Sequence, residues 1–378
     1  MNQASDDDRL ARALLCRAAE PGEPELARRV AAEGATAVVE SLLRTPPNTE
    51  LRRNWQQRIP GASPELDFAA ARSVGARFVV PGDDEWPPSL DDLPMLGREH
   101  GSIPFGLWIR GELDLRAACS RSVAVVGARA STAYGEYVAS EFAFGLVERG
   151  WAVVSGGAYG IDGAAHRGAL GRSGVTVAVL ACGVDVAYPR GHSALIERVA
   201  TTGLVISEWP PGCAPMRHRF LVRNRVIAAL TAGTVVVEAA IRSGSLSTAN
   251  RAAGLMRHVM AVPGPITSTM SEGTNELLKQ PEVACVTSAA DIVEVVGAMG
   301  TDLAPLPEKP SDPRDSLDPI SRRVLDAVPV RATVGVARIA RTAGIDSVRV
   351  GRTLGGLARE GFVERIDGGW RLAARSRR

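Results

Sequence analysis

The chain has 378 residues and a formal net charge of +2, so it is too long for one average domain, and no global electric field draws it to nucleic acid. Only Lys279 and Lys309 among its 44 basic residues are lysine; a GC-rich genome produces such a bias, although arginine also suits phosphates and base edges. The sequence has five cysteines but no C-x-x-C pair, and no apolar run near the roughly 18 residues of a membrane span. We therefore predict a reduced, cytoplasmic protein that makes no membrane contact.

Apolar residues recur at helical spacing from Leu10 to Val38, in a segment rich in Ala, Leu and Arg. We predict a small helical domain over residues 1–75, of the SAM or helix-hairpin-helix type. Proline, glycine and acidic residues fill the stretch from Pro81 to Pro94 and open a connecting region. The apolar run that follows, Phe105 to Gly111, is expected to add a strand at the edge of a sheet.

Five glycine-rich turns, each closing an apolar and strand-like run, dominate the next part of the chain. Ligands of parallel α/β sheets bind outside the carboxyl ends of the strands, where backbone N–H groups and helix N-termini point at negative charge. We therefore predict an α/β domain over residues 76–300, with a mostly parallel sheet and a phosphate-bearing ligand. The runs are continuous in Val, Ala and Leu, which is typical of strands buried on both faces. They begin at Val123, Val153, Val177, Val205 and Val235.

The end of the chain has a composition of its own. Residues 301–316 contain four prolines and six charged residues, with no room for a core, and are predicted to be a linker. Residues 317–378 show three short amphipathic helices and an alternating pair of runs around Asp367 and Gly368, which is typical of a hairpin. This pattern predicts a winged-helix domain. Its third helix carries arginines for a duplex backbone or for a protein partner: Arg349, Arg352 and Arg359.

Several catalytic and cofactor signatures are missing from the sequence. The first turn, Gly127 to Thr132, is not G-x-G-x-x-G, and the second strand ends at Ser155 instead of an acidic residue, so a dinucleotide is disfavoured. The sequence has no P-loop, nucleophile elbow, H-E-x-x-H motif or cluster of Cys and His ligands. We predict a protein that is not an enzyme and that holds no cofactor and no metal. His166 is expected to hydrogen-bond Asp162, one helical turn before it.

A candidate binding surface remains in the central domain. Arg129 lies just past the first strand, where its guanidinium is placed to reach a phosphate held by the N–H groups of Ser131 and Thr132. A solvated loop arginine is the plainer alternative.

A more specific pattern is the run RHRFLVRNRVIAAL, residues 217–230, in which cations surround an aromatic ring. A single strand needs this combination, because phosphates take the charge and a base stacks on the ring. The alternative is an amphipathic helix in which Phe220 is core, as Ile227 and Leu230 are expected to be. The binding residues predicted from this run are Phe220, Arg223, Asn224 and Arg225.

The fifth glycine-rich turn lets a ligand approach the backbone at Ser243, Gly244 and Ser245, and it then starts a helix whose N-terminus favours phosphate. Glu238, just before this turn, is an unfavourable neighbour for an anion. We expect its carboxylate to accept hydrogen bonds from the turn or from Arg225.

The order of these motifs resembles the DNA-processing protein A (DprA/Smf) family. The match runs without large gaps from Val123 to Leu278, and the flanking helical and winged-helix parts also suit the family. One motif alone would be weak, but eight in one order are specific. They are V-G-x-R, S-G-G-x-x-G-I-D-x-x-A-H, V-L-x-x-G, Y-P, S-E-x-P-P-G, F-x-x-R-N-R-x-I, V-V-E-A-x-x-x-S-G-S-L-x-T-A and V-P-G.

The resemblance implies an extended Rossmann-like fold that binds single-stranded DNA without catalysis and forms a homodimer. It also implies a role in DNA uptake and recombination, in which the protein helps load the RecA recombinase onto incoming or exposed strands. The binding pocket would then use Arg129, the group from Phe220 to Arg225, and the turn from Ser243 to Ser245.

Three positions depart from the family pattern. Tyr159 stands where many relatives have arginine, which removes a cation and offers a ring for stacking, so Tyr159 is added to the predicted site. Leu221 replaces a proline. Residues 254–259 read GLMRHV where an acidic residue and an arginine are usual.

Two other functions stay open on the sequence alone. LOG-like nucleotide phosphoribohydrolases have a related sheet and place a glutamate beside a glycine-rich turn, but their P-G-G-x-G-T-x-x-E turn is absent and Glu238 precedes the glycines here. The other function is that of an interaction adaptor working through the winged helix. Titration with single-stranded DNA separates the three functions, since only the first predicts tight binding.

Overall fold

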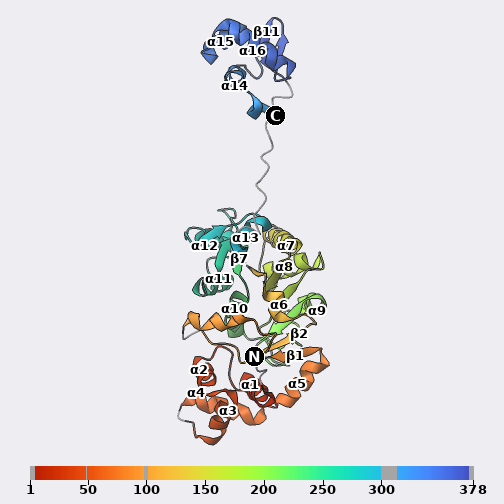
Figure 1. Cartoon of the computed structure of the whole chain (residues 1–378), viewed down its shortest axis with the longest axis vertical. Coiled ribbons are helices and arrows are strands. Elements are labelled where there is room, and N and C mark those ends of the chain that lie inside the picture. Colours follow the sequence, from red (N-terminus) through yellow and green to blue (C-terminus); the bar gives the residue numbers. More distant parts are fainter. Residues whose placement is uncertain (1–4, 48, 98–100, 299–312, 374–378) are drawn as a thin grey trace. The chain divides into compact units, whose positions relative to one another are not determined.

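The computed structural model describes residues 5–47, 49–97, 101–298 and 313–373, which form two compact units (Figure 1). Unit 1 holds the described residues up to 298, and unit 2 holds those from 313. None of the helices in these ranges is long and apolar enough to span a bilayer. Each unit contains apolar clusters of its own.

Unit 1 begins with five α-helices, and three of them start at a capping serine or threonine of the sequence. Ser5, Thr49 and Ser63 each accept a hydrogen bond from the backbone N–H three residues later, which satisfies a donor that the first turn leaves unpaired. The helices are α1 (Asp6–Ala18), α2 (Pro24–Glu33), α3 (Ala35–Arg44), α4 (Glu50–Arg58) and α5 (Pro64–Ser73).

These helices share an apolar core with the sheet that follows them. Leu15 and Leu26 are fully buried in the same cluster as Trp108 and Leu180. The rings of Phe68 and Trp108 lie 5.6 Å apart and join α5 to the sheet. The N-terminal helices are therefore an integral part of unit 1 and do not fold around a separate core.

A nine-stranded sheet forms the centre of unit 1, in the order β1-β2-β6-β5-β4-β3-β7-β8-β9. β2 runs antiparallel to both of its neighbours, and all other pairs in this sheet are parallel, which confirms the predicted α/β, extended Rossmann-like class. Each of the five predicted runs contains a strand. The strands are β1 (Ala76–Val79), β2 (Leu107–Arg110), β3 (Ser122–Val126), β4 (Ala152–Ser155), β5 (Thr176–Val179), β6 (Leu204–Ser207), β7 (Gly233–Val236), β8 (His258–Ala261) and β9 (Val283–Cys285).

The predicted edge position of the run from Phe105 to Gly111 is wrong. This run contains β2, but β1 pairs along the outer side of β2, with Ala76 opposite Arg110 and Val79 opposite Leu107. The sequence does not predict β1, because four residues directly after a helix are too few to show a pattern.

Eight further α-helices follow within unit 1, together with short 3₁₀ helices. The α-helices are α6 (Leu115–Cys119), α7 (Ala133–Glu148), α8 (Ile161–Leu170), α9 (Ser193–Thr202), α10 (Arg217–Ala229), α11 (Ser245–Gly254), α12 (Glu272–Leu277) and α13 (Ala289–Val296). The 3₁₀ helices of the described chain are η1 (Ile59–Gly61), η2 (Pro88–Leu96), η3 (Arg190–His192), η4 (Thr269–Ser271) and η5 (Pro313–Ser316), the last in unit 2.

Alternate residues of the central strands enter opposite cores, since side chains of a strand point to alternate faces of the sheet. In β3, Val123 and Val125 pack with residues of α7, α8 and α13. Ala124 and Val126 pack with residues of α10 and α11. The sheet is therefore covered by helices on both faces, which explains why its strands are continuously apolar.

The strand order changes direction between β3 and β7. From β3 the chain moves outward through β4, β5 and β6, and it then crosses to β7, β8 and β9 on the other side. The neighbouring loops after β3 and β7 therefore lead to helices on opposite faces of the sheet. A crevice between such loops is where open α/β sheets bind ligands.

After η5, the described part of unit 2 contains three α-helices and an antiparallel hairpin. Asp367 and Gly368 form its turn with φ of 47° and 78°, as a two-residue type I′ turn requires. Arg349, Arg352 and Arg359 of the third helix are exposed. Of the predicted linker, residues 301–312 lie outside the described residues. The elements are α14 (Pro319–Asp326), α15 (Val336–Ala343), α16 (Ser347–Arg359), β10 (Val363–Ile366) and β11 (Gly369–Leu372).

Candidate functional site

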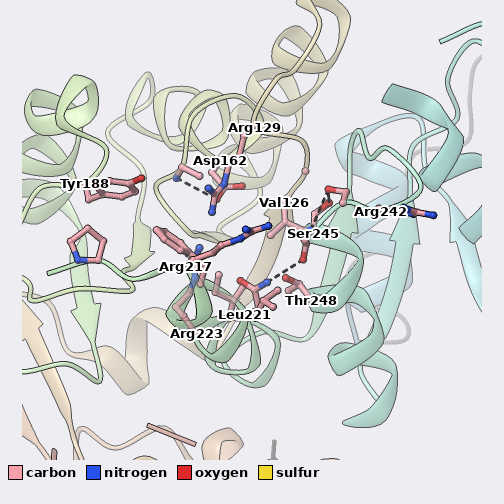
Figure 2. Close-up of a pocket in the computed structure, with 18 residues that line it drawn as sticks. Val126, Arg129, Asp162, Tyr188, Arg217, Leu221, Arg223, Arg242, Ser245 and Thr248 are labelled. Atoms are coloured by element: carbon pink, nitrogen blue, oxygen red, sulfur yellow. Dashed lines mark hydrogen bonds between the residues drawn. The ribbon is translucent and has the colours of Figure 1, made fainter. Parts of the chain in front are cut away.

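A pocket of about 580 Å³ opens at the switch point between β3 and β7 (Figure 2). Its walls come from the loops after β3, β4, β5, β6 and β7 and from α8, α10 and α11. Four arginines and one aspartate are the charged residues that line it, so its charge balance is positive. The lining residues are Val126, Gly127, Arg129, Ala158, Asp162, Tyr188, Pro215, Arg217, Phe220, Leu221, Arg223, Asn224, Ile227, Arg242, Ser243, Gly244, Ser245 and Thr248.

Most of the residues predicted for the site meet in this pocket. Those that line it are Arg129, Phe220, Arg223, Asn224, Ser243, Gly244 and Ser245. Those that do not line it are Ser131, Tyr159 and Arg225.

Arg223 is the buried cation of the pocket. Its Nη1 donates a 2.7 Å hydrogen bond to the carbonyl oxygen of Val179 at the end of β5. Burial lowers the pKa of Arg223 to about 10, against the opposing effect of the Asp162 carboxylate, so the guanidinium is charged at neutral pH. A Cβ atom at position 156 would lie 1.7 Å from Nη1, so the guanidinium fits here because Gly156 has no side chain.

Asp162 contributes a carboxylate to the same pocket. Burial raises the pKa of Asp162, and the charges of Arg223 and Arg129 oppose that rise. The Asp162 carboxylate also accepts a 3.4 Å hydrogen bond from the N–H of Ala158 (Figure 2). The pocket therefore offers both a strong donor group and an acceptor group at its inner end.

Phe220 stands in the wall of the pocket, half-buried, between a cation and another ring. The guanidinium carbon of the exposed Arg129 lies 4.5 Å from the centre of the Phe220 ring. The ring of Tyr188 lies 5.5 Å away on a tilted plane. Ile227 and Leu230, in contrast, are each only 1% exposed, as expected of core residues.

Asn224 joins α10 to the fifth glycine-rich turn. Its Nδ2 donates to the carbonyl oxygen of Gly244 at 3.2 Å and to Oγ of Ser247 at 2.9 Å. The hydroxyls of Ser243 and Ser245 lie 2.8 Å apart and hold the turn at the start of α11. A Cβ at Gly244 would meet no atom within 4 Å, so the backbone there faces open space.

The structure does not support Arg225 as a pocket residue. Its guanidinium is fully buried, forms an ion pair with Glu208 and donates to the carbonyl oxygen of Ser102. Residues two positions apart on a helix point in nearly opposite directions, so Arg225 cannot share the face of Arg223. Through Glu208 and Ser102, Arg225 holds the opposite face of α10 against the rest of unit 1.

The predicted partners of Glu238 are also wrong. Its carboxylate accepts hydrogen bonds from the N–H of Thr132 at 2.9 Å and from the hydroxyl of Thr132 at 2.6 Å. The Thr132 N–H is therefore not available to hold a phosphate, contrary to the prediction. The Ser131 hydroxyl turns away to Glu136 at 2.9 Å. A Cβ at Gly135 would lie 2.2 Å from Glu238 Oε2, so the first turn is closed around this carboxylate.

Tyr159 and His166 also differ from expectation. The half-exposed ring of Tyr159 packs edge-on against His192 at 4.8 Å, and its hydroxyl accepts a 3.3 Å hydrogen bond from the N–H of Gly191. His166 does not bond to Asp162, because its Nδ1 lies 2.8 Å from the hydroxyl of Thr176 on β5.

Sequence reasoning missed several residues that line the pocket. Arg217 and Arg242 are both exposed, and Figure 2 shows Arg242 directed away from the other labelled residues. Tyr188 arrives from the loop after β5, which the predicted site did not include. The available signal was that Arg217 begins the run of residues 217–230 and that Arg242 directly precedes the fifth turn at Ser243. Within the described ranges no group of His, Cys, Asp and Glu side chains is arranged to hold a metal ion.

Comparison with known proteins gives consistent results. A family model described as DNA recombination-mediator protein A matches residues 77–297. A putative DNA processing protein DprA from Mycobacterium tuberculosis is 44% identical over 366 residues, which cover 95% of this chain and 93% of the relative. The DNA processing protein DprA of Streptococcus pneumoniae is 42% identical over 211 residues, covering 56% of this chain and 71% of the relative.

Two solved structures share the fold. The X-ray structure of DNA processing protein A from Streptococcus pneumoniae superposes with a TM-score of 0.64 at 28% identity, covering 78% of this chain and all of that one. A structure of DNA processing protein A from Helicobacter pylori that concerns its single-stranded DNA binding mode gives a TM-score of 0.50 at 27% identity, covering 58% of this chain and 94% of that one.

Proposed function

The chain belongs to the DNA-processing protein A (DprA/Smf) family, and from that premise we propose that it binds single-stranded DNA in the pocket at the switch point between β3 and β7. The observation that carries the proposal is the presence of a buried cation, Arg223, and an accessible ring, Phe220, in one pocket. Phosphates require the first and unstacked bases require the second.

Different residues of the pocket contact the phosphate backbone and the bases of the DNA. Arg129, Arg217 and Arg223 neutralise phosphates, with Arg223 as the fixed cation and the other two as adaptable ones at the rim. A base stacks on Phe220, whose ring Arg129 already polarises from 4.5 Å. The turn from Ser243 to Ser245 lets the strand approach the backbone. The half-exposed ring of Tyr159 offers a further stacking surface outside the pocket.

We propose that the protein acts by binding alone. The hydrolase alternative requires a glutamate free to activate a nucleophile. Glu238 is only 1% exposed, and its two oxygens accept hydrogen bonds from Thr132, so it holds the first turn in shape. This geometry supports binding over hydrolysis.

The wider role that we propose follows the family. The protein, as a homodimer in the cytosol, protects single strands during DNA uptake and recombination and helps load RecA onto them. Arg349, Arg352 and Arg359, exposed on α16, are proposed to contact a duplex or a protein partner.

One titration tests the central proposal. Fluorescence anisotropy with labelled single-stranded and double-stranded oligonucleotides of one sequence should show much tighter binding of the single strand, with an affinity that falls as salt rises. Equal affinity for both forms, or no binding to either, would reject the proposal.

A further inference from the structure

A second cavity, of about 390 Å³, lies beside α10 on the side of the N-terminal helices. We call it the α10 groove; its lining includes Arg17 and Glu20 near α1, Arg58 of α4, Cys213 of the loop after β6, and Met216 and His218. It belongs to unit 1, in which the helices and the sheet share one core.

The α10 groove and the switch-point pocket share a wall. Pro215 and Arg217 line the pocket, whereas Met216, His218 and Arg219 line the groove. These residues are consecutive, so the first turn of α10 separates the two cavities. Met216, at the cap position of this helix, makes no side-chain capping bond. A chain that leaves the pocket over this turn enters the groove directly.

The carboxylate of the groove is already neutralised. Glu20 accepts hydrogen bonds from Arg219 Nε at 3.0 Å, from Arg219 Nη2 at 2.7 Å and from Trp209 Nε1 at 3.2 Å. Burial raises the pKa of Glu20, but these bonds outweigh burial and hold the pKa below its usual value. Arg17, in turn, is engaged by Asp67 at 2.5 Å.

Arg58 and His218 are the basic residues of the groove lining that are exposed to solvent. Arg58 is exposed at the end of α4, and it forms no ion pair with a carboxylate in the described part of the chain. His218 is 54% exposed by its side chain, with Nε2 3.5 Å from Glu20. Met216, 48% exposed, adds an apolar surface between them and the pocket.

We propose that a single strand held in the switch-point pocket continues over the first turn of α10 into the α10 groove, where Arg58 and His218 contact its phosphates. The inference rests on the proposed function and extends it to the N-terminal helices. Charge complementarity and the shared wall favour a single strand as the ligand of the groove. The proposed function already places this polyanion in the adjoining switch-point pocket. The N-terminal helices then lengthen the binding site instead of serving only as a scaffold.

The test compares two lengths of single-stranded oligothymidylate, about 4 and about 16 nucleotides, which span the usual range of site sizes for single-strand binding folds. The full-length protein is titrated with each, as wild type, Arg58→Ala and Arg53→Ala. Arg53 is the matched control, because it is an exposed arginine of the same helix that does not line the groove. Phe220→Ala reports on the pocket.

Arg58→Ala should weaken binding of the longer strand about fivefold in about 0.1 M salt and reduce its salt slope by about 0.7, the value for one lost phosphate contact. It should leave the shorter strand unaffected, and Arg53→Ala should match wild type with both. Phe220→Ala should weaken binding of both lengths.

Two outcomes would overturn the inference while leaving the proposed function intact. One is wild-type binding of the longer strand by Arg58→Ala. The other is equal weakening of both lengths by that variant, which would place Arg58 at the pocket or show only a general field. If wild type binds neither length, the proposed function itself fails, and the two failures are thereby distinguished.

Discussion

The guanidinium of Arg223 occupies the space that a side chain at Gly156 would need, with Nη1 only 1.7 Å from the site of a Cβ there. Two motifs that lie far apart in the sequence therefore form one structural feature, in which a glycine after β4 makes room for a cation from α10. The guanidinium also donates a hydrogen bond to the carbonyl oxygen of Val179 and is attracted by the Asp162 carboxylate. The position of the buried charge in the pocket depends on this glycine.

Gly156→Ala should displace the guanidinium and lower both stability and binding. Overpacking of this kind costs about 1–3 kcal/mol of unfolding free energy, and the pocket loses its fixed cation. Thermal melting and strand titration measure the two effects. Gly244→Ala is the control for stability, since its φ is −64° and a Cβ there meets no atom within 4 Å. A Gly156→Ala protein that melts and binds like wild type would contradict this account.

Arg129→Ala and Phe220→Ala should weaken strand binding in different ways. Losing Arg129 removes a phosphate contact and reduces the salt slope by roughly 0.7. Losing Phe220 removes stacking, worth about 1–3 kcal/mol per base, and leaves the slope nearly unchanged. Salt titrations of both variants check this, with the exposed Arg198 of α9, changed to Ala, as control. A Phe220→Ala protein that binds normally but melts early would show that the ring is only structural.

His166 should make the protein sensitive to acid. Burial lowers the pKa of His166 from 6.5 to about 3, so below pH 6.5 the unfolded chain gains a proton that the native state does not bind. The contribution of this group to the unfolding free energy is fully present above pH 6.5. As the pH falls from 6.5 towards about 3, the unfolding free energy should decrease by up to about 1.4 kcal/mol per pH unit.

Urea denaturation at a series of pH values checks the His166 prediction. His166→Asn, which keeps a polar atom for the Thr176 hydroxyl, should show a flatter dependence on pH than wild type. Equal slopes in wild type and His166→Asn would show that His166 is protonated in the folded protein.

Glu238→Gln should destabilise the first turn without revealing any catalytic role. An amide cannot accept both hydrogen bonds from Thr132, and bonds to a charged group are worth about 1.5–3 kcal/mol. Glu136→Gln, at a side chain that is 49% exposed, should change stability little. Neither variant nor wild type should release base or phosphate from nucleoside monophosphates. Turnover that survives repurification and disappears in Glu238→Gln would favour the hydrolase alternative.

A chain that ends at Ala298 should fold and keep most of its single-strand affinity. Unit 2 has its own core, which includes Val324, Leu354 and Leu357, and it contributes no residue to the apolar cluster of α10 and α11 that supports the pocket. Circular dichroism and strand titration of the truncated protein measure this. Loss of nearly all binding in a folded truncation would place the main site in unit 2.

The sequence predicted the five central strands because burial on both faces leaves a pattern that needs no partner to be recognised. Runs such as Val123 to Val126 are apolar at every position. They are therefore recognised without the alternation of apolar and polar residues that marks a strand buried on one face only. The sequence did not predict β1, because Ala76 to Val79 is short and its pairing with β2 joins segments that are distant in the sequence. That missing partner also explains the wrong edge assignment.

The candidate site was predictable as far as it is local. Phe220, Arg223 and Asn224 stand on one helix, and their meeting with the turn at Ser243 follows from the rule for open sheets. Arg225 was wrongly assigned to the site because the prediction grouped consecutive residues, whereas Arg223 and Arg225 lie on opposite faces of α10. The partner of Glu238 is Thr132, in a loop after a different strand, and only the packed structure brings these two together.

The N-terminal helices and the later strands of the sheet share one apolar core, but they are synthesised at different times. Strand β6 is made about 130 residues after the end of α5, an interval of about 7 to 26 s at about 5–20 residues per second. Until that interval ends, the cluster that holds Leu15, Leu26 and Val38 lacks Val205, its residue from β6. Part of the apolar surface of the nascent N-terminal helices therefore stays uncovered on the ribosome, and chaperones bind exposed apolar surface of this kind during synthesis.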